Sequence, residues 1–172
     1  MRSARAYVGL GSNLGDRLMT LQSATRHLQR ALPGVVLSAC STIYESRPIG
    51  PARHAFLNAA VELRGSIDPE ALLQALLRIE ALHGRRREIR WGARTLDLDL
   101  LVVLREGESL ERASEHLTLP HPGLHQRDFV LAPLAELNPG LRPDGRHRVD
   151  RLLEALPTVT RTIFERLQEP LC

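Results

Sequence analysis

The sequence predicts a ferredoxin-like α+β domain, in which two helices pack on one face of an antiparallel sheet and a helical extension follows at the C-terminus. Three observations lead to this prediction. Strand-length apolar runs and helical repeats follow one another in the order β-α-β-β-α-β, proline and glycine separate them, and 172 residues suffice for a substantial core. No internal repeat or long linker interrupts the chain, so we expect one domain over residues 1–172.

The boundaries of the expected elements follow from local signals. Leucines at helical spacing continue from the first strand to Pro33, where proline and glycine stop the helix. The second helix begins after the N-cap Asp68 and ends before Gly84. The expected strands are residues 6–11, 35–44, 56–63 and 95–103, and the other expected helices are 18–32, 126–137 and about 149–156.

Composition excludes several classes of protein. Apolar residues make up 43% and charged residues 25% of the chain, as is ordinary for a soluble globular protein. No apolar run approaches the roughly 20 residues needed to cross a bilayer, and the N-terminus has no long apolar signal segment. The two cysteines, Cys40 and Cys172, imply no disulfide framework, and the sequence does not show whether they are close together. We therefore expect a cytoplasmic protein without a membrane partner.

The stretch RWGARTLDLDLL, residues 90–101, places two carboxylates in an apolar run. Asp97 and Asp99 are two residues apart on an expected strand, so they share one face, with Cα atoms about 6.6 Å apart. Like charges at this spacing can hold one hard cation, or two ions about 3.5–4 Å apart. The alternative is a strand whose acidic side simply faces water. We favour Mg²⁺ because aspartate is depleted in strands.

Arginines crowd the segment just before the acidic pair. All 23 basic residues of the chain are arginines, and five of them lie between residues 85 and 94. Phosphoryl transfer needs cations for the transferred group and a metal clamp for nucleophile and leaving group. Arg85, Arg87 and Arg94 could supply those cations. A solvated basic loop is the alternative, but the adjacent carboxylates favour a polyphosphate ligand.

The glycine-rich GLGSNLGD, residues 9–16, is close to a dinucleotide-binding fingerprint. However, no acidic residue follows about 20 positions later to bind a ribose. A tight turn that lets a flat ligand approach the backbone fits these residues equally well.

His121 and His125 are four residues apart, a spacing that suits zinc on a helix. Pro122 and Gly123 oppose a helix there, and no third zinc ligand is evident. We therefore prefer His121 as a phosphate contact. Phe56 and Phe129 could each form a wall of a slot for a planar ligand.

Five stretches together resemble the 6-hydroxymethyl-7,8-dihydropterin pyrophosphokinases of the folate pathway. The resemblance spans about residues 6–150, and WGxRTLDLD followed by LxLPHPxxxxRxFVLxPL is its most specific part. It implies a ferredoxin-like core and the transfer of pyrophosphate from ATP to the hydroxymethyl oxygen of the pterin, with release of AMP. The matching stretches are GSNLGDR (11–17), YESRPIG (44–50), FLNAAVEL (56–63), IEALHGRRREIRWGARTLDLDLL (79–101) and LTLPHPGLHQRDFVLAPLAEL (117–137).

The resemblance also implies roles for individual residues. Asp97 and Asp99 would bind two Mg²⁺ ions and, with Arg85 and Arg94, form the catalytic set. The predicted ATP contacts are Glu80, Arg87, Arg94, His121 and Arg127, and the predicted pterin contacts are Ser46, Ile49, Phe56, Asn58, Trp91 and Phe129. Phe56 and Phe129 would sandwich the ring, and Arg47 would add a charge beside it.

Two other functions are compatible with parts of the sequence. A ferredoxin-like sheet with an arginine cluster suits an RNA-binding domain, although the aromatic RNA-binding signatures are missing and the acidic pair would repel phosphate without metal. A dinucleotide-dependent oxidoreductase would depend on the glycine-rich stretch alone. We therefore expect small-molecule substrates and no nucleic acid. The residues leave the oligomeric state open, with a monomer slightly favoured.

Overall fold

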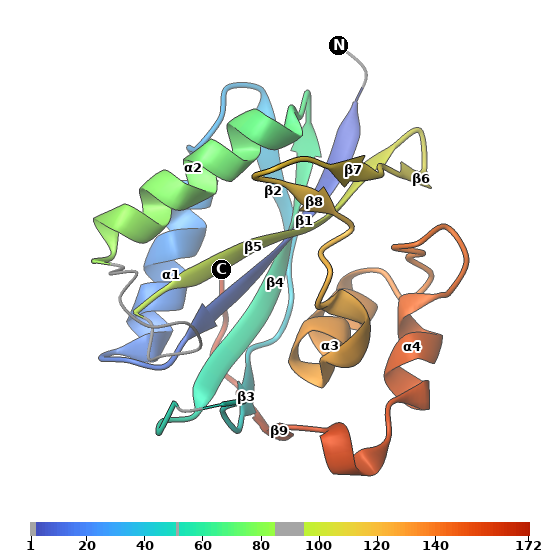
Figure 1. Ribbon diagram of the computed structural model, residues 1–172. Coiled ribbons are helices and arrows are strands. Elements are labelled where there is room, and N and C mark those ends of the chain that lie inside the picture. The colour runs from blue at the N-terminus through green and yellow to red at the C-terminus, as the bar shows by residue number, and fades with distance from the viewer. Residues whose placement is uncertain (1–2, 51, 85–94) are drawn as a thin grey trace.

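The computed structural model describes residues 3–50, 52–84 and 95–172. It contains the ferredoxin-like core that the sequence predicts, followed by a C-terminal extension (Figure 1). The strands are β1 (Ala4–Ser12), β2 (Val35–Cys40), β3 (Tyr44–Ser46), β4 (Phe56–Gly65), β5 (Asp97–Arg105), β6 (Glu108–Ser109), β7 (Arg112–Ala113), β8 (Thr118–Leu119) and β9 (Ile163–Arg166). The helices are α1 (Arg17–Leu28), α2 (Pro69–Leu82), α3 (Asp128–Leu137) and α4 (Val149–Ala155), with short 3₁₀ turns at 124–126 and 158–160.

The main sheet has the strand order β6-β5-β1-β4-β3-β9, and β2 also pairs with β4. All of these pairs are antiparallel. The single strand expected over residues 35–44 is in fact two strands, β2 and β3. The chain leaves the ladder after Cys40, where Ser41 Oγ accepts the Ala60 N–H at 2.9 Å and the Thr42 N–H is donated to Glu136 at 2.9 Å.

Helix boundaries follow the capping signals closely at α2 and less closely at α1. Asp68 accepts the Ala71 N–H at 3.2 Å, Pro69 occupies the first helical position, and Gly84 follows the helix with a φ of +73°. These are the features that the sequence predicts. Helix α1 ends at Leu28, four residues before the expected end, because the chain turns toward Gly34, which has a φ of +72°.

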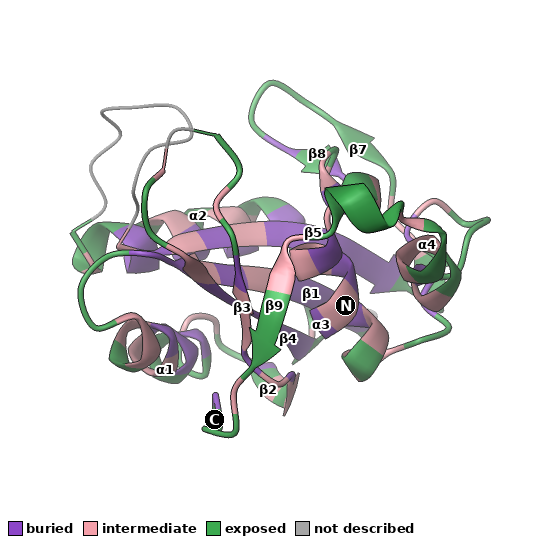
Figure 2. Cartoon of the chain, turned by 90° about the horizontal axis from the view of Figure 1, so that it is seen from below, coloured by how far each residue is buried: buried purple, intermediate pink, exposed green. Residues whose placement is uncertain are grey.

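Helices α1 and α2 cover one face of the sheet, as expected. Their leucines pack against alternate residues of β1, β4 and β5, and this apolar layer is the larger core of the molecule. Figure 2 shows the buried residues concentrated on the central strands and on the sheet-facing sides of the helices. On β5, Leu98 and Leu100 point into this core, which leaves the alternate positions for the opposite face.

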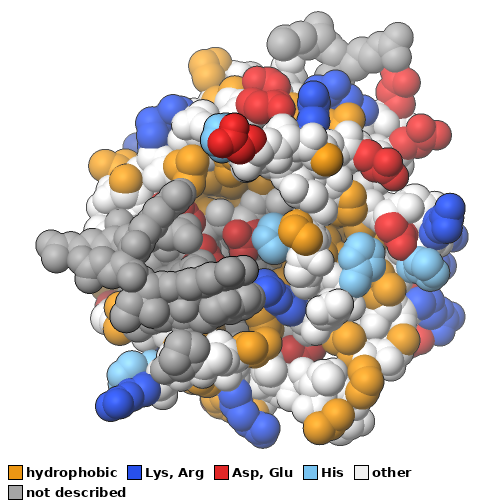
Figure 3. Space-filling model, viewed as in Figure 1, with side chains coloured by type: hydrophobic (Ala, Val, Ile, Leu, Met, Phe, Trp, Pro, Cys, Tyr) orange, Lys and Arg blue, Asp and Glu red, His pale blue; other side chains and the backbone are white. Residues whose placement is uncertain are grey.

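Helices α3 and α4 cover part of the opposite face and form a second core there. Its members include Tyr7, Leu101, Val102, Leu131 and Leu134. The register between β1 and β5 shifts between Tyr7 and Val8, so that Leu101 and Val102 both pack into this second core. Among the described residues no further helix covers this face, and acidic and histidine side chains gather at a hollow near its middle (Figure 3).

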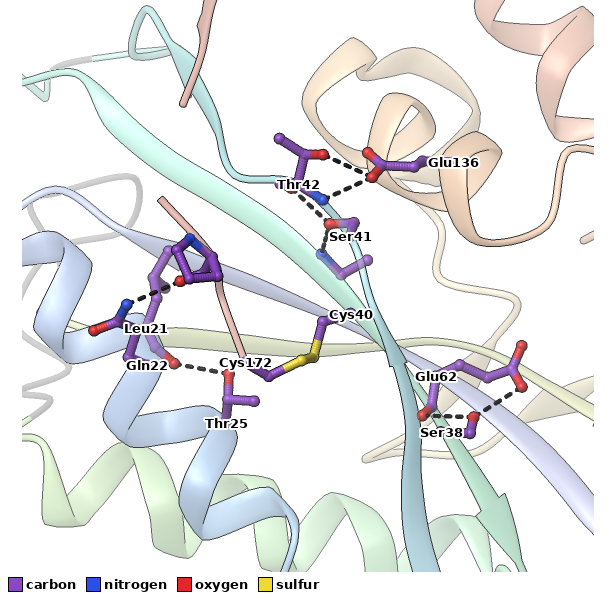
Figure 4. Close-up of a disulfide and its surroundings, with 12 residues drawn as sticks. Leu21, Gln22, Thr25, Ser38, Cys40, Ser41, Thr42, Glu62, Glu136 and Cys172 are labelled. Atoms are coloured by element: carbon purple, nitrogen blue, oxygen red, sulfur yellow. Dashed lines mark hydrogen bonds between the residues drawn. A yellow bond between two sulfur atoms is a disulfide. The ribbon is translucent and has the colours of Figure 1, made fainter. Parts of the chain in front are cut away.

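The C-terminal segment contains two features that the sequence did not predict. Strand β9 pairs with β3, and beyond it Cys172 forms a disulfide with Cys40 at the end of β2, with a Cα–Cα distance of 6.3 Å (Figure 4). The sequence left open whether the two cysteines lie close together, and the structure joins them. The pairing could not be predicted because 132 residues separate the cysteines. Among the described residues, no helix is long and apolar enough to cross a membrane.

Candidate functional site

Two glycines of β1, Gly9 and Gly11, form the floor of the hollow on the open face. Gly11 lies opposite Asn58 on β4 and Asp97 on β5, and Gly9 lies opposite Asp99. Residues directly opposite one another in a sheet share a face, so these polar side chains surround a strip of bare backbone. A Cβ built at Gly11 would lie 3.7 Å from Asn58 Oδ1 and 3.9 Å from Asp97 Cβ. Glycine thus keeps the space between them open.

The glycine-rich stretch is therefore not a dinucleotide-binding turn. Gly9 and Gly11 lie inside a strand, and only Gly15, with a φ of +65°, occupies the turn that leads into α1. A flat ligand can still approach the backbone here, because the glycines lack side chains.

This floor belongs to a pocket of about 270 Å³, which we call the open-face pocket. It brings together nine of the residues that the sequence resemblance implied. Arg85, Arg87, Trp91 and Arg94 lie outside the described residues, and their roles stay predictions. The nine lining residues are Ser46, Ile49, Phe56, Asn58, Asp97, Asp99, His121, Arg127 and Phe129.

The two carboxylates of β5 both line the open-face pocket, as the two-residue spacing predicts. Asp97 and Asp99 are partly exposed, whereas Leu96, Leu98 and Leu100 are buried. Two carboxylates on one face suit Mg²⁺, which commonly takes one or two protein carboxylates and completes its coordination with water and substrate phosphates. Within the described ranges no group of three or more acidic, histidine or cysteine side chains could hold a metal alone. As a pair of carboxylates, Asp97 and Asp99 fit a metal that is bound together with a phosphate ligand.

His121 lies beside this acidic pair, with its Nε2 3.9 Å from Asp99 Oδ1. Its Nδ1 accepts the Gly123 N–H at 3.2 Å, so the neutral ring carries its proton on Nε2. Burial lowers the pKa of His121, and the charge of Arg127 lowers it further, against the opposing effect of Asp97. A neutral His121 thus presents an N–H donor to the acidic end of the pocket.

His121 and His125 do not form a zinc pair. The second histidine lies away from the open-face pocket, with its Nε2 3.7 Å from Asp144 Oδ2. The intervening proline and glycine predicted that no helix carries both histidines on one face. This prediction is confirmed, because the chain forms a short 3₁₀ turn, Leu124–Gln126, at this point.

Aromatic and amide groups form the other end of the pocket. Phe56 begins β4 and Phe129 lies in the first turn of α3, and both line the pocket. Asn58 is buried and its Nδ2 donates to Ser46 Oγ at 2.8 Å, which orients the amide. The Arg127 guanidinium lies 6.0 Å from the centre of the Phe129 ring. A planar heterocycle with a polar edge suits this combination of aromatic faces and hydrogen-bonding groups.

Glu80 is the one described candidate residue that does not line the open-face pocket. It lies on α2, is 2% exposed, and accepts the Leu98 N–H at 2.7 Å. Leu98 separates the two aspartates of β5, so Glu80 supports the acidic pair from behind the sheet. A direct ATP contact through Glu80 stays a prediction.

Sequence reasoning missed several parts of the pocket. Leu101 and Val130 line it as apolar residues indistinguishable in sequence from core residues. Arg47, which was expected beside the pterin, also lines the pocket. The signal for Gly9 and Gly11 was present, since their alternation matches that of the aspartates, but it becomes visible only once the register between β1 and β5 is known.

The open-face pocket suits a small planar ligand, and relatives of this chain define its class as pyrophosphokinase. The family described as 7,8-dihydro-6-hydroxymethylpterin-pyrophosphokinase matches residues 7–139. The chain belongs to this family.

Curated relatives carry the name 2-amino-4-hydroxy-6-hydroxymethyldihydropteridine pyrophosphokinase. The protein from Methylorubrum extorquens is 41% identical over 165 residues, which cover 95% of this chain and 99% of the relative. The protein from Pseudomonas aeruginosa is 45% identical over 155 residues, covering 89% and 92%. The protein from Bacillus subtilis is 47% identical over 133 residues, covering 77% of each chain.

Solved structures support the fold. A crystal structure of HPPK-DHPS in complex with substrates has a TM-score of 0.67 at 14% identity and covers 90% of this chain. A Plasmodium falciparum HPPK-DHPS triple mutant has a TM-score of 0.66 at 14% identity and covers 89%. This chain spans less than half the length of those structures, 43% and 44% respectively. The similarity covers most of the fold described above.

Proposed function

We propose that the open-face pocket is the active site at which this chain performs the reaction of its family. The chain is an ATP-dependent pyrophosphokinase, which transfers pyrophosphate from ATP to the hydroxymethyl group of 6-hydroxymethyl-7,8-dihydropterin in folate biosynthesis. The observation that carries the proposal for the site is that two carboxylates and two aromatic side chains line one pocket. The RNA-binding and oxidoreductase alternatives are set aside.

The acidic end of the pocket is the proposed site of ATP and of two Mg²⁺ ions. Asp97 and Asp99 would hold the ions, which neutralise phosphate charge and make the substrate hydroxyl more acidic. His121 would donate its Nε2–H to a phosphate oxygen, and Arg127 would add a positive charge beside it. Arg85, Arg87 and Arg94, which belong to the predicted ATP and catalytic set, would act on the same polyphosphate.

The aromatic end of the pocket is the proposed site of the pterin. Phe56 and Phe129 would enclose the ring, and Trp91 stays a predicted further contact. The oriented amide of Asn58, with Ser46 and the region of Ile49, would read the hydrogen-bonding edge of the ring. In this arrangement the hydroxymethyl group would point to the carboxylates, and its oxygen would attack the β-phosphorus of ATP in line with the departing AMP oxygen. Because bound metal ions would make the hydroxyl more acidic, its proton could pass to water without a separate general base.

We further propose that the chain acts as one domain in the cytoplasm, where its nucleotide substrate is abundant, and that its partners are these small molecules alone. We also propose that the chain acts as a monomer.

Formation of AMP from ATP and 6-hydroxymethyl-7,8-dihydropterin tests the proposed function. We expect AMP only when both substrates and Mg²⁺ are present. Asp97→Asn should lower kcat by at least about 10³-fold, because it weakens metal binding at the reacting phosphate. Glu108→Gln, which alters an exposed acid on β6, is the matched control and should leave kcat unchanged. Near-normal turnover by a folded Asp97→Asn protein would refute the metal assignment.

A further inference from the structure

One wall of the open-face pocket is supported by the C-terminal segment. Strand β9 runs antiparallel to β3, with Ile163 opposite Ser46. Next to the residue pair Ser46 and Ile163, the Arg47 N–H donates to the Thr162 carbonyl at 3.0 Å. Ser46 and Arg47 both line the pocket. The strand that carries this wall is therefore held between β4 on one side and β9 on the other.

Asp128 lies in the opposite wall of the pocket, at the start of α3, and accepts hydrogen bonds from the same C-terminal segment. It lies between two pocket residues, Arg127 and Phe129, but it is itself 3% exposed. Its Oδ2 accepts the N–H groups of Thr162 at 2.6 Å and Ile163 at 2.8 Å. Its Oδ1 accepts the Thr162 hydroxyl at 2.7 Å and the Phe129 N–H at 2.9 Å. These four neutral donors compensate the desolvation of the carboxylate.

We propose that Asp128 is a positioning residue for the pterin end of the open-face pocket and that it acts through Thr162. The connection runs from the Phe129 N–H to the Asp128 carboxylate, then through Thr162 to the Arg47 N–H. We call these linked groups the Asp128 clasp. The clasp joins the wall that begins α3 to the wall that ends β3. The proposal depends on the proposed function, because it takes the pterin as the ligand between these walls.

The clasp affects binding because a slot for a flat ring depends on the spacing of its walls. Phe129 belongs to the α3 wall, and Phe56 lies opposite Ser46 on the side of β3. Release of the clasp lets these two aromatic residues move apart without removing either of them. A displacement of about 1 Å in a positioned site can cost as much as 10²-fold in rate or affinity.

Steady-state kinetics separate this role from a purely structural one. Asp128→Ala removes all four acceptor contacts, and we expect the KM for the pterin to rise about tenfold while kcat and the KM for ATP stay within about threefold. Asp128→Asn is the conservative variant. Its oxygen can still accept the two backbone N–H groups and its amide can donate to the Thr162 hydroxyl, so it should recover much of the loss.

Thr162→Val and Thr160→Val form a matched pair that tests the same point with smaller changes. Thr162 donates its hydroxyl to Asp128, whereas Thr160 donates its hydroxyl to the Pro157 carbonyl at the surface, at 2.8 Å. Thr162→Val should raise the KM for the pterin and Thr160→Val should not. Should Asp128→Ala fail to fold, this pair and Asp128→Asn decide the question. Variants that are less stable but keep the KM of the parent would overturn the proposal.

Amide hydrogen exchange gives a readout that needs no substrate. We expect exchange of the Arg47 N–H to accelerate about tenfold or more in Asp128→Ala, although this amide does not touch residue 128, and to change much less in Asp128→Asn. Unchanged exchange at Arg47 would overturn the clasp even if the parent enzyme uses the pterin. If the parent protein failed to use the pterin, the proposed function would fail and the positioning proposal with it.

Discussion

At the scale of single residues, the open-face pocket depends on the lack of a side chain at Gly11. A Cβ at Gly11 would meet its nearest neighbours at 3.7–3.9 Å, which is ordinary van der Waals contact. Gly11→Ala should therefore fold and keep most activity, whereas the branched side chain of Gly11→Val extends over the floor. We expect Gly11→Val to raise the KM for the pterin by about tenfold or more at similar stability, since valine suits a strand. Equal kinetics of the valine variant and the parent would contradict this view of the floor.

Glu62 is a buried carboxylate outside the pocket whose effect depends on pH. Burial by itself raises the pKa of Glu62, but hydrogen bonds from Arg64, Tyr7 and Ser38 outweigh burial and the net pKa is below its usual value. The Tyr7 hydroxyl donates to Glu62 Oε2 at 2.9 Å and the Ser38 hydroxyl to Oε1 at 2.9 Å. Because the pKa is lower in the folded state, the ionised carboxylate stabilises the fold above pH 4.5, the reference value for an unperturbed glutamate, and this contribution is lost as the pH falls through the folded pKa.

Comparison of the parent with Glu62→Gln tests this linkage. The difference in free energy of unfolding between the two proteins should be about 1–3 kcal/mol at neutral pH and should shrink below about pH 4.5. Urea denaturation at several pH values measures it. A difference that is constant with pH would show that the charge of Glu62 does not contribute.

At the scale of elements, α2 supports the acidic pair of β5 through one buried contact. Glu80 accepts the Leu98 N–H at 2.7 Å, and Leu98 lies between Asp97 and Asp99. Glu80→Ala leaves this amide without that acceptor, which should cost about 1–3 kcal/mol of stability. The Mg²⁺ concentration for half-maximal activity should also rise, because the aspartates lose their support. Glu80→Gln keeps an acceptor oxygen and should retain more of both properties, as urea denaturation and Mg²⁺ titrations of activity would show.

Local signals were sufficient to predict most of the elements. The N-cap Asp68, the alternation of Leu98 and Leu100 with the aspartates, and the leucine repeats each depend on residues close together in the chain. Strand β9 was missed because IFER has little apolar alternation, and its partner β3 lies about 120 residues earlier. Pairing between strands so far apart in the chain cannot be predicted from neighbouring residues.

The candidate site likewise contains residues that local sequence signals predicted and residues that they did not. Specific motifs identified the nine candidate residues that line the pocket. They did not identify the floor, because the register that places Gly9 and Gly11 opposite the aspartates cannot be read from the sequence. Asp128 was missed because three of its four hydrogen bonds go to residues 34 and 35 positions later. Its position between Arg127 and Phe129 was the only available signal.

At the scale of the whole molecule, the disulfide anchors the last residue of the chain to the main sheet. Cys40–Cys172 closes a loop of more than a hundred residues, and the loss of such a cross-link typically costs about 2–4 kcal/mol. Cys172→Ser should lower the free energy of unfolding by this amount in oxidising buffer, which urea denaturation would show as a lower midpoint. Its kcat should stay within about twofold of the parent, since neither cysteine lines the pocket.

Reductant provides the control for this prediction. It should lower the midpoint of the parent protein to that of Cys172→Ser and should leave the variant unchanged. A parent protein whose midpoint does not respond to complete reduction would contradict a stabilising disulfide.

The two faces of the main sheet have different roles. One face forms the larger core with α1 and α2, and the other is shared between the second core and the open-face pocket. Asp97 and Asp99 can remain partly exposed because their neighbours in β5 supply the buried apolar contacts. The proposed chemistry therefore requires that both carboxylates stay on the open face.

A crystal structure with a non-hydrolysable ATP analogue, 6-hydroxymethylpterin and Mn²⁺ in place of Mg²⁺ tests this requirement most directly. We predict anomalous scattering peaks within about 2.0–2.3 Å of carboxylate oxygens of both Asp97 and Asp99, with the pterin between Phe56 and Phe129. Peaks that contact neither aspartate in a crystal containing both ligands would contradict the account.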